Sequence, residues 1–274
     1  MDMKIQIVIL AVLLTSSTAD DYCQGIFFKE KYYNIQLLKE GVNRVHQMVY
    51  NRNDNTLYFT FEQIAKYPTR MLAFLNIKTR ETGIIDSIRN ATGLAIDQNA
   101  NRLYVGGSDG LFFLNVNNRV TEKLPVNDDI HYLFLNSVVY FINNRKEAFI
   151  FDHGDVYPVM ELRGVVVEKL IVDDDNNILF LNNKKLFRVK MGSTLINSFD
   201  KYSVDVIATD ANFRPYICAS SGVFVYNKYK LALDKVAEMN GLRAMTFTGI
   251  DNPIYVVIDN IVKLKYNPVP CFGD

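Results

Sequence analysis

Five ionisable residues stand at the same point of a pattern that recurs along the chain, nine to twelve residues before an aromatic side chain. They are His46, His131, Lys169, Asp205 and Arg243. Cationic and imidazole side chains donate charge-assisted hydrogen bonds to anions, and two or three of them brought together would repel a divalent metal. We therefore predict that this set binds an organic anion. The alternative is that these residues are solvated and share no purpose.

The recurrent pattern predicts the elements that position this set. It consists of an apolar strand, a turn rich in Asp and Asn, and a second strand, whose aligned aromatic residues are Tyr58, Tyr104, Tyr140, Phe180, Tyr216 and Tyr255. Their spacings are 46, 36, 40, 36 and 39 residues. A repeat of about 40 residues that contains several short strands is typical of a β-propeller. We predict an all-β fold, a six-bladed β-propeller, in which the candidate site residues begin inner strands beside a central channel.

The last repeat lacks a fourth strand. Several repeats are followed by a more polar segment that we predict to be an outer strand, at residues 83–88, 120–124, 156–162 and 195–199. After Leu264 the chain runs into Asn267-Pro268-Val269-Pro270 and leaves no room for such a strand. The segment Tyr32 to Leu38, which precedes the first repeat, is expected to fill the vacancy. This would close the ring and remove an exposed sheet edge.

The N-terminal residues 1–19 have the features of a signal peptide. Lys4 precedes the apolar run from Ile5 to Leu14, and Ser17-Thr18-Ala19 is a small-residue cleavage site. An apolar run of about ten residues is too short for a membrane anchor, which needs about twenty. We therefore expect a secreted protein in which residues 20–274 form a single propeller domain.

Because disulfides form in extracellular proteins, a role can be predicted for each of the three cysteines. Cys23 and Cys271 lie near the two ends of the mature chain, which a propeller brings together, so we predict a disulfide between them. Cys218 lies inside a predicted strand and is expected to be a free, buried thiol. Asn90 begins the sequon Asn90-Ala91-Thr92 and is a candidate glycosylation site.

Two other motifs favour structural roles. The triplet Asp173-Asp174-Asp175 lacks the Gly and the bidentate Glu of an EF-hand loop. Asp97 and Asp210 occupy the same place in other repeats, where such a side chain caps a tight turn. The glycine-rich segment 106–110 joins two predicted strands and opens no helix, so we interpret it as a turn and not as a phosphate cradle.

The sequence contains few features that indicate an enzyme. It contains no Gly-x-Ser-x-Gly elbow, and its three histidines lack metal-ligand spacing with one another or with cysteine. With 30 Lys and Arg against 30 Asp and Glu, the net charge is zero, which gives no bulk attraction to nucleic acid or to an anionic membrane. We expect a monomeric, non-enzymatic protein with a small-molecule ligand and with neither metal nor cofactor.

A family resemblance makes the ligand more specific. The segments Asp21-Tyr22-Cys23-Gln24-Gly25-Ile26, Asn101-Arg102-Leu103-Tyr104-Val105-Gly106-Gly107 and Pro270-Cys271-Phe272-Gly273 resemble those of the insect ommochrome-binding proteins. These segments are repeat and terminal features, so no binding residue is carried over from the family. The resemblance implies a haemolymph carrier of ommochromes, which are flat phenoxazinone pigments such as ommatin D with carboxylate, amino and in some cases sulfate groups.

Two other classes of function fit the same fold, because a fold does not fix a function. One is a lactonase-like or esterase-like hydrolase, in which calcium would need carboxylates and amides around the channel. The other is a propeller that binds proteins through its loop face. The colour of the purified protein would distinguish a pigment carrier from both.

Overall fold

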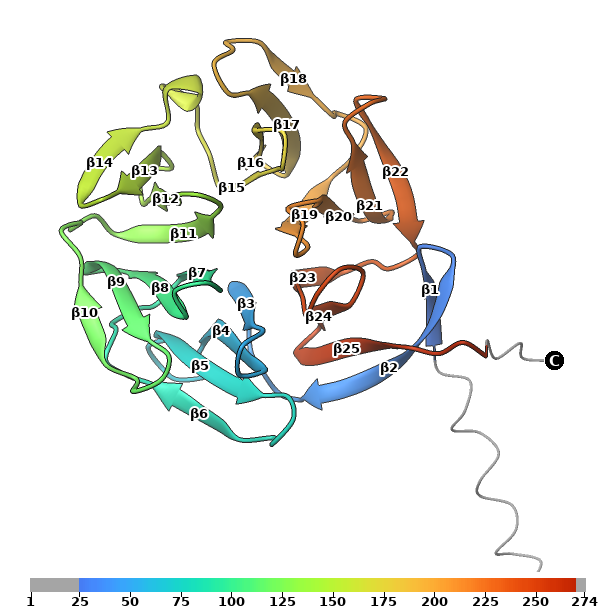
Figure 1. Ribbon diagram of the computed structural model, residues 1–274, viewed down its shortest axis with the longest axis horizontal. Helices are drawn as coiled ribbons and strands as arrows, with labels where there is room; N and C mark the ends of the chain where they lie inside the picture. The colour runs from blue at the N-terminus through green and yellow to red at the C-terminus, as the bar shows by residue number, and fades with distance from the viewer. Residues whose placement is uncertain (1–24, 270–274) are drawn as a thin grey trace, which may run out of the picture.

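The computed structural model describes residues 25–269, which form 25 β-strands in six sheets arranged around a central axis (Figure 1). The exception to β-structure among these residues is one short 3-10 helix, Met160–Leu162. The prediction of an all-β, six-bladed propeller is therefore confirmed. No helix among the described residues is long and apolar enough to cross a membrane.

The strands of each blade run outward from the centre in antiparallel order. The inner strands are β3 (Gln47–Asn51), β7 (Gly93–Asp97), β11 (Ile130–Leu135), β15 (Lys169–Val172), β19 (Val204–Thr209) and β23 (Leu242–Phe247). The second strands are β4 (Thr56–Glu62), β8 (Arg102–Gly107), β12 (Val139–Asn143), β16 (Asn177–Asn182), β20 (Pro215–Ala219) and β24 (Pro253–Val257). The third strands are β5 (Arg70–Asn76), β9 (Gly110–Asn115), β13 (Ala148–Asp152), β17 (Lys185–Lys190), β21 (Gly222–Asn227) and β25 (Asn260–Tyr266). The outer strands of the first five blades are β6 (Thr82–Ile85), β10 (Thr121–Lys123), β14 (Asp155–Pro158), β18 (Ile196–Ser198) and β22 (Ala232–Ala237).

The six aligned aromatic residues lie in the second strands, one in each blade, as predicted. Their rings fill the spaces between neighbouring sheets, where the apolar core lies. One large cluster, for example, contains buried residues of blades 3, 4 and 5, among them Tyr140, Phe180 and Ile217. Because a blade exposes two faces and cannot cover both alone, stacking around the ring buries them in turn.

The turns between inner and second strands use the Asp residues as predicted. Asp173 Oδ1 accepts hydrogen bonds from the amides of Asp175 and Asn177, at 2.9 and 2.7 Å. Asp97 and Asp210 cap their own turns in the same way. The segment 106–110 is also a turn, since it connects the paired strands β8 and β9.

The ring is closed by the N-terminal segment, as predicted. Strand β2 (Lys31–Lys39) pairs with β25 and supplies the missing outer strand of the sixth blade. A further strand, β1 (Gly25–Phe28), pairs with β2 and makes this blade five-stranded, which the sequence analysis did not anticipate. The two strands meet in a tight turn at Lys29 and Glu30, where φ is 49° and 62°.

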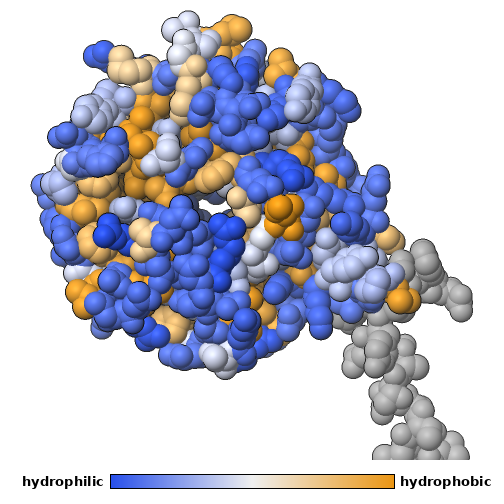
Figure 2. Space-filling model, viewed as in Figure 1, coloured by the Kyte–Doolittle hydropathy of each residue, from blue (hydrophilic) through white to orange (hydrophobic). Residues whose placement is uncertain are grey.

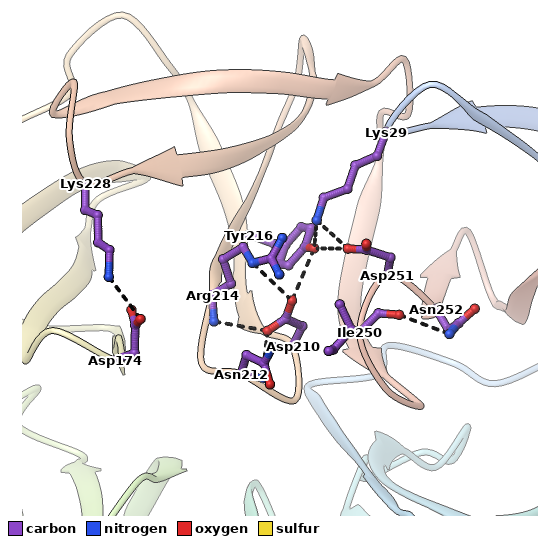
Figure 3. Close-up of polar contacts among 10 residues, drawn as sticks. All are labelled: Lys29, Asp174, Asp210, Asn212, Arg214, Tyr216, Lys228, Ile250, Asp251 and Asn252. Carbon is purple, nitrogen blue, oxygen red and sulfur yellow. Dashed lines mark hydrogen bonds and ion pairs between the residues drawn. The ribbon is translucent and has the colours of Figure 1, made fainter.

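The turn of this hairpin inserts Lys29 between blades 5 and 6 (Figure 3). Its ammonium donates to the hydroxyl of Tyr216 at 2.5 Å and forms an ion pair with Asp251, whose carboxylate also accepts from Tyr216 at 2.9 Å. The neighbouring Phe28 is fully buried and stacks on the Tyr216 ring, with centroids 6.0 Å apart. We call Lys29, Tyr216 and Asp251 the closure triad, because it fastens the hairpin to both blades.

All four predicted outer strands are shorter than expected, and one of them ends in a helix. The segment 156–162 leaves the sheet after Pro158 and enters the 3-10 helix. Val159 and Leu162 are both 2% exposed, and the bend lets both point inward, whereas a continued strand would turn alternate side chains outward. The predicted signal peptide at residues 1–19 and the predicted Cys23–Cys271 disulfide lie outside the described residues.

Candidate ligand-binding channel

A cavity of about 270 Å³ runs along the axis of the ring, and all six inner strands contribute to its lining. Figure 2 shows its opening at the centre of the molecule. The volume is close to the lower end of the range for small-molecule pockets, roughly 300–1,000 Å³. A site at this position fits a compact, flat ligand that reaches the channel from one end.

One ring of residues around the channel is defined by strand register. Its members pair with the residue that follows the aligned aromatic, and all six line the cavity: Met48, Leu94, Leu133, Lys169, Ile207 and Ala244. Five of the six are apolar and at most 4% exposed. We call this set the channel ring. Lys169 is its single charged member, and a charge among apolar neighbours is costly unless it has a partner.

The ammonium of Lys169 is only partly satisfied by the protein. It donates one hydrogen bond, to the backbone carbonyl of Asp205 at 2.8 Å, and it forms no ion pair with a carboxylate of the described residues. The Asp205 carboxylate is instead paired with Lys184 at 2.8 Å. Burial lowers the pKa of Lys169, opposed by the nearby charge of Asp205. Because an ammonium has three donors, Lys169 keeps donors for a ligand.

Of the other predicted residues that line the channel, Arg243 is already paired with a carboxylate and His46 has no hydrogen bond at its Nε2. Arg243 lines the cavity but lies 3.0 Å from the Asp259 carboxylate, and both side chains are more than 40% exposed. His46 also lines the cavity, and its Nε2 is buried without a hydrogen bond, 3.4 Å from Glu62 Oε1. Burial and then the charge of Arg70 lower the pKa of His46, while Glu62 opposes both. His46 is therefore a neutral imidazole at neutral pH, with an unused polar atom.

A more open cavity of about 480 Å³ forms the mouth at this end of the channel. It brings together three of the predicted residues, His46, Asp205 and Arg243, with Arg44 beside them. Arg44 pairs with Glu62 at 3.2 Å, so each strong cation of this mouth already has a carboxylate. Lys169 lies in the narrower channel and not in the lining of the mouth.

The five predicted residues are not equivalent in the structure. His131, Asp205 and Arg243 each occupy the irregular step at the start of an inner strand, where the register shifts past one residue. Such a bulge re-aims a side chain. His131 lines neither cavity, and its imidazole lies 3.4 Å from Asp129, whereas Asp205 and Arg243 at the same step line the mouth. Lys169 is not at a bulge, because it pairs directly with Leu181 and belongs to the channel ring.

Gln47 is the channel residue that the sequence analysis missed. Its amide nitrogen donates to the carbonyls of Leu94 and Leu133, at 2.8 and 2.6 Å. Its amide oxygen accepts from the amides of the same two residues, at 3.0 and 3.4 Å. The side chain thus ties together the free inner edges of blades 1, 2 and 3. No feature of the sequence distinguished Gln47, because polar residues such as Asn51 occur in the same inner strand.

Two further predictions concern individual residues, Cys218 and Asn90. Cys218 is a buried free thiol, as predicted, and burial raises its pKa to about 12. Asn90 is half-buried with φ at 48°, and its carbonyl accepts from the Thr92 hydroxyl at 3.0 Å. Its glycosylation stays a prediction. Asn143, the last residue of β12, caps the turn that follows and is 1% exposed, so its side chain is unavailable to a ligand.

Comparison with known proteins adds one functional relative and several structural ones. The chain is 21% identical over 241 residues to the ommochrome-binding protein of Manduca sexta, covering 85% of this chain and 88% of that protein. No family model matches the sequence. Among solved structures it resembles a putative gluconolactonase, with a TM-score of 0.67 and 12% identity over 86% of this chain and 92% of the other.

A second similar structure is the calcium-binding protein regucalcin of Agrobacterium tumefaciens. Its TM-score is 0.64 at 12% identity, over 88% of this chain and 98% of that one. At this level of identity both structures support the propeller fold alone. Within residues 25–269 no three His, Cys, Asp or Glu side chains are grouped so that they could hold a metal ion.

Proposed function

We propose that this protein is a secreted, non-enzymatic carrier that holds an ommochrome-like pigment in its central channel, for transport or storage in haemolymph. The observation that carries the proposal is the charge of Lys169 in a channel ring that is otherwise apolar. A flat aromatic anion has the matching composition, since its rings suit the apolar wall and its acidic groups suit the ammonium. The distant similarity to a protein named for ommochrome binding supports the same class of ligand.

The proposed arrangement gives the site residues unequal roles. Lys169 anchors an acidic group of the pigment, and the unpaired Nε2 of His46 offers a weaker polar contact beside it. Arg243 and Asp205 hold ion pairs at the mouth, so they shape the approach to the channel and contribute little binding energy. No catalytic residue and no metal take part.

The competing function is a hydrolase of the lactonase type, since a putative gluconolactonase has the same fold. Calcium would require several oxygen ligands around the channel. Asp205 in the lining of the mouth is instead engaged by Lys184, and the Glu62 and Asp259 carboxylates are engaged by Arg44 and Arg243. This pairing favours a carrier over a calcium-dependent hydrolase.

The test begins with the absorption spectrum of protein purified from its natural fluid. A bound pigment would give a visible band that travels with the protein and is released by denaturation. Recombinant protein should then bind a purified ommatin with one-to-one stoichiometry in an absorbance titration. A colourless native protein that also fails this titration would disprove the carrier, and turnover of a lactone above background would support the hydrolase.

A further inference from the structure

One aromatic side chain of the channel has an unusual backbone conformation. Phe213 lies in the turn between β19 and β20 with φ at +56°, and its ring lines the channel cavity. This left-handed region is uncommon for residues other than Gly, Asn and Asp, and a bulky side chain there is an outlier. The surrounding structure therefore maintains Phe213 in an unfavourable conformation.

The other blades show what this turn ordinarily contains. In four of them the residue with positive φ in the corresponding turn is Asn or Asp, namely Asn55, Asn101, Asn176 and Asp251. Those side chains tolerate the left-handed region because they form local hydrogen bonds. Blade 5 thus replaces a residue that suits the turn with one that does not. An unfavourable residue held in place at a cavity is a reason to look for a functional role.

The ring of Phe213 reaches an aromatic partner from a different blade. It lies edge-on to Phe134 of β11, with centroids 6.4 Å apart and planes at 78°. Blade 4 separates these two residues in the ring order, and both line the channel. Phe134 is only 9% exposed and is fixed by packing, whereas Phe213 is half-buried and presents its ring to the cavity. Together they form an apolar aromatic wall, which we call the phenyl wall.

The phenyl wall and Lys169 serve the same cavity from different positions along the inner strands. Lys169 is the first residue of β15, and Phe213 follows the last residue of β19, so the two belong to opposite ends of the channel. The cavity thereby combines a cationic end with an aromatic end. A flat ring system that carries an acidic group matches this distribution.

We propose that the phenyl wall of Phe213 and Phe134 is the stacking subsite for the aromatic rings of the ligand, so that the rings lie inside the channel and not on its mouth. The proposal rests on the proposed function for the identity of the ligand, and on the cavity for its location. Phe213 stacks directly on the ligand, and Phe134 holds Phe213 in place from across the channel. The unfavourable turn is retained because Asn at this position would remove the ring.

The decisive variant is Phe213→Asn, which installs the residue that other blades use at this turn. We expect it to fold with a melting temperature near that of the parent, because relief of the backbone offsets lost packing. Its affinity for a purified ommatin should fall by roughly threefold to tenfold, the worth of an aromatic contact. Its bound pigment should show an absorption band shifted toward that of free pigment. Phe213→Tyr, which keeps the ring, should retain both affinity and band.

A matched control is Tyr229→Asn, which removes an aromatic ring from the same blade outside the channel. Tyr229 is 89% exposed and lines neither cavity, so this change should leave affinity unchanged. Parent affinity and parent absorption band in Phe213→Asn would overturn the phenyl wall while the carrier function stood. Loss of binding in Tyr229→Asn as well would also overturn it, since the ring would then act without lining the channel.

A second probe distinguishes this proposal from the proposed function. 1-Anilinonaphthalene-8-sulfonate is an aromatic sulfonate whose fluorescence rises in apolar sites. If the parent protein does not bind ommatin but binds this probe, and Phe213→Asn weakens that binding, the pigment assignment is wrong. The phenyl wall is then the stacking subsite for another aromatic anion. If the parent binds neither compound, both proposals are overturned.

Discussion

Replacing Lys169 by Met isolates the charge of the channel ring. Met has similar length and an apolar character like that of its five neighbours in the ring, so the change removes the ammonium without opening a large cavity. The protein itself loses one hydrogen bond, the one to the Asp205 carbonyl at 2.8 Å. A bound anion would lose its charge-assisted contact at the same time.

The loss of ligand affinity should be larger for Lys169→Met than for a change at an exposed, paired cation. A hydrogen bond to a charged group contributes about 1.5 to 3 kcal/mol, so the affinity for an ommatin should fall roughly tenfold to a hundredfold. Arg243→Ala is the matched control, because Arg243 lines the same cavity but is exposed and paired with Asp259. An exposed ion pair is worth about 0.2 to 1 kcal/mol, which corresponds to less than about a fivefold loss. The sequence alone gave these two cations equal weight.

Lys169→Met should weaken ligand binding without lowering the stability of the protein. Because burial lowers the pKa of Lys169, the unfolded chain binds the proton more tightly than the folded one. Stability therefore rises with pH between the folded pKa and the ordinary value of 10.5. At neutral pH the buried charge opposes folding, so we expect Lys169→Met to melt no lower than the parent. A residue with a purely structural role would show a lower melting temperature.

The pH profile provides a third readout. Binding to the parent should weaken on the alkaline side as Lys169 loses its proton, and Lys169→Met should lack this alkaline decline. The measurements are an absorbance titration across pH and a thermal melt of each variant. If Lys169→Met binds ommatin as tightly as the parent and shows the same alkaline decline, the anchor is elsewhere and the reasoning fails.

Three further predictions concern closure, thiols and calcium. Lys29→Met should lower the free energy of unfolding by about 1 to 3 kcal/mol. Although burial alone would raise the pKa of Asp251, hydrogen bonds from Lys29 and Tyr216 lower it. The stabilisation that the closure triad provides should therefore be lost as pH falls below 3.8. An acid-unfolding transition in Lys29→Met that is unchanged from the parent would contradict this prediction. A thiol reagent should find no reactive cysteine in the native protein, one in denaturant and three after reduction, whereas three in denaturant alone would exclude the predicted disulfide. Calcium at micromolar concentration should give no saturable heat in titration calorimetry, and a one-to-one isotherm would support the hydrolase instead.

Most of the fold was predictable because it repeats. Six aligned aromatic residues located six second strands, and the missing outer strand after Leu264 pointed to Tyr32–Leu38. The extra strand β1 was not predictable from the repeat, since it has no counterpart in the other blades. The closure triad was also missed, because Lys29 and Asp251 are 222 residues apart and meet only when the ring closes.

The candidate site was less predictable because counting residues cannot detect bulges. Stepping back from each aromatic placed Lys169 beside Asp205 and Arg243, yet these two lie at bulges and Lys169 does not. A one-residue slip changes the face on which a side chain lies. His131 lines neither cavity although it occupies the same step as Asp205 and Arg243, and Gln47, the first residue of β3, was overlooked because counting back from Tyr58 reached His46 instead.

Lys169 and Phe213 are the two channel residues that depart from the pattern of the other blades. The acidic residues of the channel are occupied within the protein: Asp97 and Asp210 cap turns, and Asp205 pairs with Lys184. A hydrolase would need one of these groups, or a metal they hold, to act on a bound substrate. What the channel leaves for a ligand is the ammonium of Lys169 and the unused Nε2 of His46 at one end and the phenyl ring of Phe213 at the other. Lys169 and Phe213 stand where other blades carry apolar residues and Asn or Asp. These groups match an aromatic anion in charge and in apolar character, which supports the proposed carrier.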